Sequence, residues 1–140
     1  MLKPWLPYLI GLAFATAANV GFASQVTVVA SICDIVHSPE KYDDRRVSFR
    51  SHVESDGVHG AYLAEPECDK GITLESGGRA DWTDLNRIMD TIGTVGTARK
   101  SVEASWVGVV HVKGPVISFS ADGISDVTYK LSDGLRRRAK

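Results

Sequence analysis

The chain has 140 residues, with 16 Lys and Arg, 17 Asp and Glu, and two cysteines. Four of the positive charges lie in the last five residues, so residues 24–135 hold 11 basic against 17 acidic side chains, a net charge of −6. An acidic body repels phosphate backbones, whose neutralisation by Lys and Arg supplies most non-specific nucleic-acid affinity, and this disfavours a DNA- or RNA-binding role.

Residues 1–23 have the pattern of a secretory signal peptide. Lys3 gives a short positive start, and the apolar stretch of residues 5–18 that follows is short for a bilayer span. Gly21 and Ala23 supply small residues for a cleavage site after Ala23. Removal of these 23 of the 140 residues leaves 117, enough for one domain, with a periplasmic or secreted location. The alternative is a segment that stays as a membrane anchor.

Cys33 and Cys68 are the only cysteines. Thiols exported to an oxidising compartment are oxidised rather than kept reduced, so the simplest expectation is one disulfide. Such a bridge is worth roughly 3 to 4 kcal/mol by loop-closure entropy. The alternative is two separate thiols, in which case Cys33 could act as a thiolate with His37 four residues further on.

A short helix is predicted to begin after Ser31. Its side chain and that of Asp34 can serve the unpaired amides at the start of a helix. Pro39 then restarts the chain in a short helical turn, at a first position where its missing N–H has no consequence. Tyr42 is expected to cover the edge of the core.

From Val47 the pattern changes to a period of two, which indicates a half-buried strand. The inner set is Val47, Phe49, Ser51 and Val53, and the outer set is Ser48, Arg50, His52 and Glu54. The turn residues 55–57 make residues 58–64 the natural hairpin partner. A loop containing Cys68 follows, and residues 72–75 form a short third strand.

The clearest helix of the chain lies between Asp81 and Gly93. Asp81 and Asp84 favour its N-terminus, and Gly93 is placed to close its C-terminus. The apolar stripe of this helix is predicted to be core rather than a cofactor site; it consists of Trp82, Leu85, Ile88, Met89 and Ile92.

Residues 102–113 alternate again as a strand, which Gly114-Pro115 interrupts. Residues 116–119 extend the sheet, Asp122-Gly123 is predicted to turn, and residues 124–131 supply the last strand. Three strands, a helix and two or more strands, preceded by an extra helix, are in the order of an OB-type barrel. The predicted class is therefore α+β, mainly β: an OB-like five-stranded barrel with a helix between strands 3 and 4 and an extra N-terminal helix. Other small α+β sheets are the alternative.

Several framework features follow one another between residues 31 and 75: a cysteine in the first helix, a Ser-Pro-x-x-Tyr turn, an alternating strand, and a second cysteine before Gly-Ile-x-Leu. They are carried by Cys33, Pro39, Tyr42, Val47, Phe49, Val53, Cys68, Gly71, Ile72 and Leu74. This pattern resembles a group of small bacterial exported proteins with an OB-like fold. The turn at residues 43–45 and Ser51 depart from the group, which usually has glycine there. The resemblance implies a fold and a location, and it implies no chemistry because the group has no established activity.

No strong catalytic or metal-binding motif is present: the sequence has no G-x-S-x-G, H-E-x-x-H or C-x-x-C. His52 and His59 flank the predicted hairpin turn, and His111 lies on a later strand. With Glu54 and Asp56, these histidines could serve a small metal-dependent or general acid/base hydrolase. Such a hydrolase is the alternative hypothesis.

The preferred hypothesis is an exported, non-enzymatic binding or interaction module, with no cofactor and no metal. We expect it to meet a protein, a glycan or a small ligand through the face of its first strands. The expected binding residues are Arg50, His52, Glu54, His59 and Tyr62. The domain is placed at residues 24–135, and residues 136–140 are expected to form a solvated basic tail rather than a membrane contact.

Overall fold

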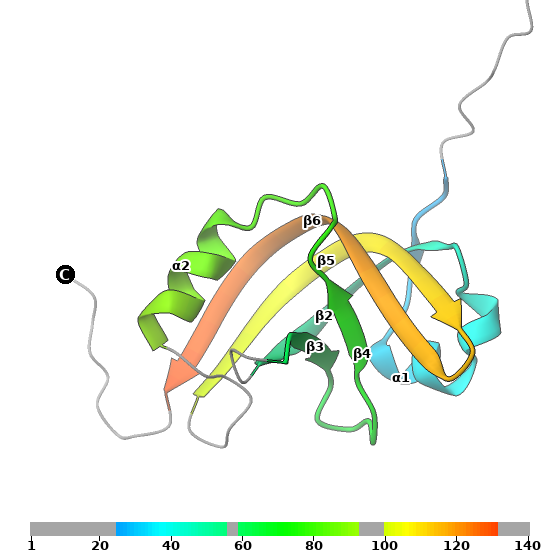
Figure 1. The fold of residues 1–140 in the computed structure, drawn as a ribbon, viewed down its shortest axis with the longest axis horizontal. Coiled ribbons are helices and arrows are strands. Elements are labelled where there is room, and N and C mark those ends of the chain that lie inside the picture. Colours follow the sequence, from blue (N-terminus) through cyan, green and yellow to red (C-terminus); the bar gives the residue numbers. More distant parts are fainter. Residues whose placement is uncertain (1–24, 56–58, 93–99, 132–140) are drawn as a thin grey trace, which may run out of the picture.

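The computed structural model describes residues 25–55, 59–92 and 100–131, which form a mainly β structure with two α-helices (Figure 1). The strands are β1 (Val28–Val29), β2 (Arg46–Ser55), β3 (Ala61–Ala64), β4 (Ile72–Glu75), β5 (Lys100–Lys113) and β6 (Val116–Leu131). The helices are α1 (Ile32–His37), the 3-10 turn η1 (Pro39–Lys41) and α2 (Thr83–Ile92). The predicted signal peptide, the basic tail and the closing residue Gly93 lie outside the described residues.

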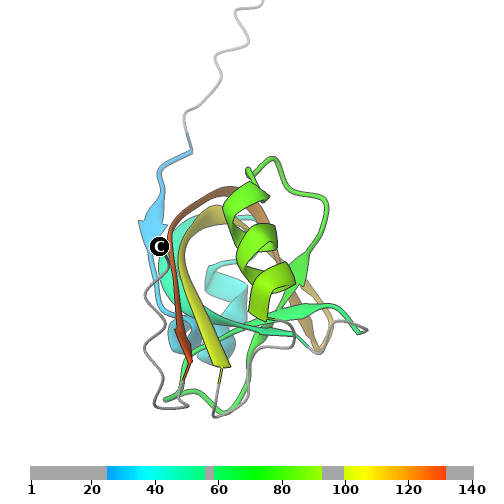
Figure 2. The ribbon, with the colours of Figure 1, turned by 90° about the vertical axis from the view of Figure 1, so that its left-hand side faces the viewer.

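Five of these strands close into a barrel. Their order is β2-β3-β4-β6-β5, and the antiparallel pairing of β5 with β2 closes the ring. The pairings are antiparallel except that of β4 with β6, which is parallel. β1 adds a short parallel pairing to β2. Figure 1 and Figure 2 show the long, curved β5 and β6 arching over the barrel, with α1 and α2 toward opposite ends.

The barrel interior is an apolar core built by alternation along the strands. The inner side of β2 is buried as predicted; it consists of Val47, Phe49, Ser51 and Val53. Trp106 of β5 is 1% exposed and packs edge-on against Phe119 of β6, with ring centroids 6.4 Å apart. Trp82, just before α2, lies 6.3 Å from Trp106, and Leu85 is buried. The described part of the predicted stripe of α2 is therefore core.

The last strand differs from the sequence prediction. Asp122-Gly123 is not a turn between two strands, because β6 runs without a break from Val116 to Leu131. Val107 of β5 pairs with Gly123 of β6, whereas the next residue, Gly108, pairs with Ala121. Asp122 is therefore an extra residue in β6, and the strand has a bulge there. A bulge bends a strand and increases its twist while the pairing continues. Asp122 is accommodated on the strand by an ion pair with Arg46 of β2.

The turn after Tyr42 places an aspartate at a position with a positive φ. Asp44 has φ 53°, a left-handed conformation that Asp tolerates better than most residues. Its N–H donates to the Val110 carbonyl at 2.9 Å, and its Oδ1 lies 3.0 Å from Nδ1 of His111. The turn at residues 43–45 is therefore tied to β5.

Candidate functional site

Arg50 lies on the outer side of β2 and reaches across β5 to β6. Its Nε and Nη2 donate to Oε2 of Glu103 at 3.3 and 3.2 Å. Its Nη1 donates to Ser105 Oγ at 3.3 Å and to the Asp126 carbonyl at 3.2 Å, and Nη2 also donates to Thr128 Oγ1 at 3.0 Å. These five contacts match the five N–H groups of a guanidinium. The charge of Arg50 is therefore directed over β5 and β6, with every donor engaged.

His52 shares the carboxylate that Arg50 holds. Its Nε2 lies 3.2 Å from Oε1 of Glu103, the residue directly opposite on β5. The side chains of Arg50, His52 and Glu103 are 42, 27 and 26% exposed, so this cluster is open to solvent. Ion pairs that face water contribute about 0 to 1 kcal/mol to stability. The contacts fix the geometry of the face more than they stabilise the fold.

A hollow of about 220 Å³ adjoins this cluster; it is lined by Arg50, Ser51, His52, Glu65, Pro66 and Glu103. It lies where an edge of β2 lacks a neighbour among the described strands. On that edge β1 pairs with β2 at Val47 and Ser48, and β3 pairs with it only from His52 to Ser55. Residues 49–51 in between have no strand partner there. The hollow is thus a gap between two short strands.

The other predicted binding residues divide into near and far positions. Glu54 and Tyr62 are opposite each other on β2 and β3, and Tyr62 is 45% exposed. Glu54 therefore lies on the same strand as Arg50 and His52, and Tyr62 lies on the neighbouring strand. His59 is exposed. His52 pairs with Ala64 of β3, and His59 comes five residues before Ala64, which corresponds to roughly 16 Å of extended chain. His59 therefore lies toward the end of the hairpin.

The three histidines of the hydrolase hypothesis do not come together. His111 and Glu103, the partner of His52, are eight residues apart on β5, roughly 26 Å along the strand. In the described part of the chain, the group of potential metal ligands with atoms within 4.8 Å of one another is Cys33, Glu65 and Cys68. Two of its ligand atoms are the sulfurs of a disulfide. The hydrolase hypothesis therefore lacks the shared cleft that it needs.

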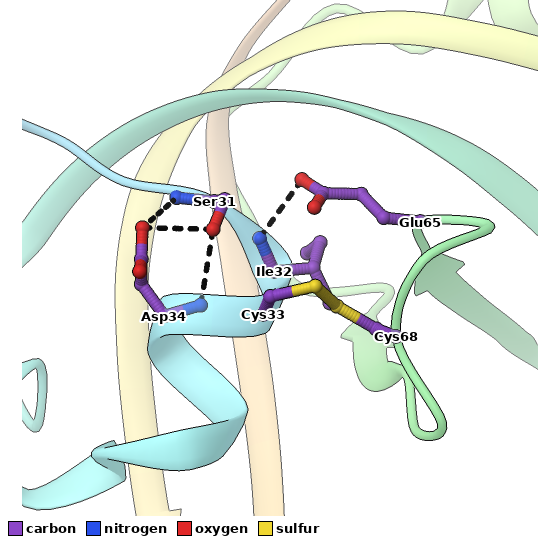
Figure 3. The surroundings of a disulfide bond; sticks show 6 residues. All are labelled: Ser31, Ile32, Cys33, Asp34, Glu65 and Cys68. Carbon is purple, nitrogen blue, oxygen red and sulfur yellow. Dashed lines mark hydrogen bonds between the residues drawn. A yellow bond between two sulfur atoms is a disulfide. The ribbon is translucent and has the colours of Figure 1, made fainter.

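The predicted disulfide between Cys33 and Cys68 is confirmed, with Cα atoms 5.4 Å apart and a sequence separation of 35. No free cysteine is left for the thiolate alternative. The bond ties α1 to the loop between β3 and β4, which also carries Glu65 (Figure 3). Oε1 of Glu65 accepts the N–H of Ile32 at 2.9 Å, and its carbonyl accepts the N–H of Cys68 at 3.0 Å. Glu65 is therefore held in place between the disulfide and the hollow.

Ser31 and Asp34 form the predicted capping box at the start of α1 (Figure 3). Ser31 Oγ accepts the N–H of Asp34 at 3.0 Å, while Oδ2 of Asp34 accepts the hydroxyl and the N–H of Ser31 at 2.7 and 3.1 Å. Hydrogen bonds from the Ser31 side chain and backbone lower the pKa of Asp34 below its usual 3.8. The ionised form of Asp34 is thus stabilised by the folded state.

The capping box predicts a pH-dependent stability. A carboxyl whose pKa is lower in the folded state contributes fully above its unfolded pKa, and the contribution is lost as the pH falls through the folded pKa. We expect Asp34→Asn to be less stable than wild type at neutral pH, and the difference to shrink as the pH falls below 3.8. Urea unfolding over a pH series measures the free energy of unfolding of the wild type and of Asp34→Asn at each pH. A difference between the two proteins that stays constant at all pH values would contradict this account.

Ser31→Ala removes the side chain that caps α1. We expect it to lower the free energy of unfolding by about 1 kcal/mol at neutral pH.

A larger hollow of about 500 Å³ lies beside α2; its lining is Gly60, Ala61, Leu74, Glu75, Ser76, Trp82 and Asn86. Its carboxylate, Glu75, accepts the hydroxyl of the buried Ser118 at 2.6 Å. Trp82 belongs to the aromatic packing of the core. None of the residues predicted for binding lines this hollow.

The fold and these contacts define the class of this protein: a mainly β, disulfide-bonded closed barrel with a charged cluster on the outer side of β2 and β5. No family model, no curated protein and no solved structure matches the chain. The resemblance to small exported proteins therefore stays a prediction. Within the described ranges, none of the helices is long and apolar enough to cross a membrane.

Two residues of this site escaped the sequence analysis. Glu103 completes the cluster, but only the register of β2 against β5 brings it opposite His52. Glu65 lies in a loop without any recognisable motif, whereas in the structure it joins α1 to the hollow. The alternation along residues 102–113 could have placed Glu103 on the polar side of its strand. No sequence signal identifies the strand partner of Glu103.

Proposed function

We propose that this protein is an exported, non-enzymatic binding module built on an OB-like barrel. The barrel order β2-β3-β4-β6-β5 supports the OB assignment, as does the position of α2 between β4 and β5, the third and fourth barrel strands. The signal-like residues 1–23 and the disulfide support a periplasmic or secreted location, because disulfides persist in oxidising compartments.

The binding face consists of Arg50, His52, Glu54 and Tyr62, with Glu103 added from β5. The observation that carries the proposal is the Glu103 carboxylate shared by Arg50 and His52 beside an open hollow. The network fixes Arg50, His52 and Glu103 without burying them, and side chains that are already fixed lose little entropy on binding. Exposed Tyr and Arg are also the residue types that most often dominate binding energy.

The contacts of the face favour binding over catalysis. A hydrolytic site needs a nucleophile, a base and an orienting group within reach of one another. Here His52 lies against Glu103, which Arg50 holds from the other side. The described cysteines are joined, and His111 belongs to a different end of the barrel.

The test is a pull-down of the mature domain from an envelope extract, with matched variants. Tyr62→Ala is compared with Tyr129→Ala, because the two tyrosines are 45 and 44% exposed. Arg50→Ala is compared with Arg87→Ala, an exposed arginine of α2. We expect a partner that wild type and both controls retain and that the face variants lose by about 30-fold, as for residues central to an interface. Failure to enrich any partner, or equal retention by all variants, would overturn the proposal.

A further inference from the structure

We propose that reduction of the Cys33–Cys68 disulfide converts the junction between α1 and the β3–β4 loop into a site for a zinc ion. The ligands are the thiolates of Cys33 and Cys68 and the carboxylate of Glu65. In the oxidised protein the two sulfurs are bonded to each other, so the site exists only after a dithiol has reduced them. The site belongs to α1 and the loop, and it does not depend on the binding face around Arg50.

Three residues with metal-binding side chains meet at this junction. The sulfurs of Cys33 and Cys68 and a carboxylate oxygen of Glu65 all lie within 4.8 Å of one another. A tetrahedral zinc ion, with Zn–S about 2.3 Å and Zn–O about 2.1 Å, places its ligand atoms roughly 3.6 to 3.8 Å apart. The oxygen is therefore at a suitable distance, and the sulfurs reach theirs by separating after reduction.

Contacts other than the disulfide keep these ligands together. The N–H of Cys68 donates to the carbonyl of Glu65 at 3.0 Å, which closes a turn in the loop. Two intervening residues are also a common spacing between zinc ligands. Cys33 enters from α1, which is fixed by its capping box and by the full burial of Ile32 and Ile35. These contacts remain after reduction and hold the three side chains near one another.

A backbone donor orients Glu65 toward the junction. Its Oε1 accepts the N–H of Ile32 at 2.9 Å (Figure 3), and among the described residues its Oε2 has no partner. Carboxylates that bind metals are usually held by such additional hydrogen bonds, which fix their orientation. All three ligand residues are half-buried rather than sealed from solvent, so a reductant and an ion can reach them.

The ligand types select zinc. Thiolates are soft ligands that favour Zn²⁺, whereas Ca²⁺ and Mg²⁺ prefer shells made of oxygen atoms. Three protein ligands leave the fourth tetrahedral position of the ion to water. The ion connects α1 to the β3–β4 loop and thus takes the place of the covalent bond that reduction removes.

The redox step uses a dithiol, such as a reduced Cys-X-X-Cys protein. One of its thiols forms a mixed disulfide with one protein cysteine and releases the other. Its second thiol then closes the reductant's own disulfide and releases the remaining cysteine. Two electrons pass from the dithiol to Cys33 and Cys68, whose S–S bond is broken. Each thiol loses its proton on binding Zn²⁺, so two protons are released for each ion bound.

The test compares the oxidised mature domain with the same domain reduced by dithiothreitol and freed of it under anaerobic conditions. Co²⁺ is added first, because thiolate-bound tetrahedral Co²⁺ has charge-transfer and strong visible absorption that the hydrated ion lacks. We expect these bands only in the reduced domain, with Zn²⁺ displacing Co²⁺ at one ion per chain. Saturating Zn²⁺ should raise the melting temperature of the reduced domain by at least about 5 °C, and Ca²⁺ should not.

Matched variants identify the ligands. Glu65→Gln keeps an oxygen for the N–H of Ile32 and removes the charged ligand. We expect at least about a 10-fold loss of Zn²⁺ affinity, since changes even in the surroundings of a metal ligand have effects of this size. Glu67→Gln makes the same change of net charge at an exposed site of the same loop and should bind as reduced wild type does. Replacing both cysteines by serine should abolish binding.

The proposal is wrong if the reduced domain binds no Zn²⁺, if the double serine variant binds it equally well, or if Glu65→Gln binds as wild type does. Equal binding by the oxidised domain would also overturn it, because the ion would then occupy another site. Native mass spectrometry gives the stoichiometry. One ion shared between two chains would contradict the proposal, since the ligands would come from different molecules.

Discussion

Replacing Cys33 and Cys68 together by serine should lower the free energy of unfolding by about 4 kcal/mol. The disulfide closes a loop with a sequence separation of 35, and loss of that closure increases the conformational entropy of the unfolded chain. The free energy of unfolding of a native protein is about 5 to 15 kcal/mol, so this loss is a large share of the total. A fall in melting temperature of roughly 15 to 30 °C corresponds to it.

The folded state should also loosen around the site. The disulfide holds α1, whose Ile32 and Ile35 are fully buried, against the loop that positions Glu65. Urea unfolding followed by tryptophan fluorescence, to which the buried Trp106 contributes, measures the stability of the wild type and of the double variant, each with and without reductant. Reductant should destabilise the wild type and leave the double variant unchanged. Equal midpoints for oxidised and reduced wild type would contradict the prediction.

Gly108→Ala should lower the free energy of unfolding by about 3 kcal/mol, the upper part of the usual range for overpacking. A Cβ at this position would lie 2.1 Å from the carbonyl oxygen of Ser120 and 2.7 Å from Cζ of Phe119. The first of these atoms is backbone of β6, paired with β5 around the bulge. It cannot move away without disturbing that pairing, so the clash has no inexpensive relief.

Gly123→Ala is the matched control for this variant. Gly123 lies on β6 opposite Val107, and a Cβ there would meet only the Cβ of Val107 at 3.8 Å, an ordinary contact. We expect its unfolding free energy to stay within about 1 kcal/mol of wild type. Chemical denaturation of the two variants beside wild type gives the comparison. Equal losses at Gly108 and Gly123 would show that the close approach to Ser120 does not govern the stability of this region.

Local patterns predicted much of the framework. The Ser31 and Asp34 cap, the turn at Pro39 and the strand Ile72–Glu75 all appear where the sequence places them. Each of these features depends on side chains a few residues apart, so the local sequence is sufficient to predict it. Asp81 likewise accepts the N–H of Thr83 at 2.9 Å at the start of α2.

Long-range geometry decided the site. Arg50 reaches residues 53 to 78 positions away in the sequence, and this reach depends on how the barrel closes. The strand register puts Glu103 opposite His52 and leaves His111 far along β5. Asp122-Gly123 has the composition of a turn, yet β6 stays continuous because a bulge and the ion pair with Arg46 accommodate it.

The sequence by itself therefore predicted a mainly β class of fold, one disulfide and the polar side of β2, because alternation, capping and cysteine count are local or compositional properties. Only the tertiary structure decided which charges meet. It engaged every donor of Arg50, turned Glu65 toward α1 and left a gap in the pairing of β2 at residues 49–51. The physical reason is that hydrogen bonding across a closed barrel joins residues whose separation in the chain carries no signal of their contact.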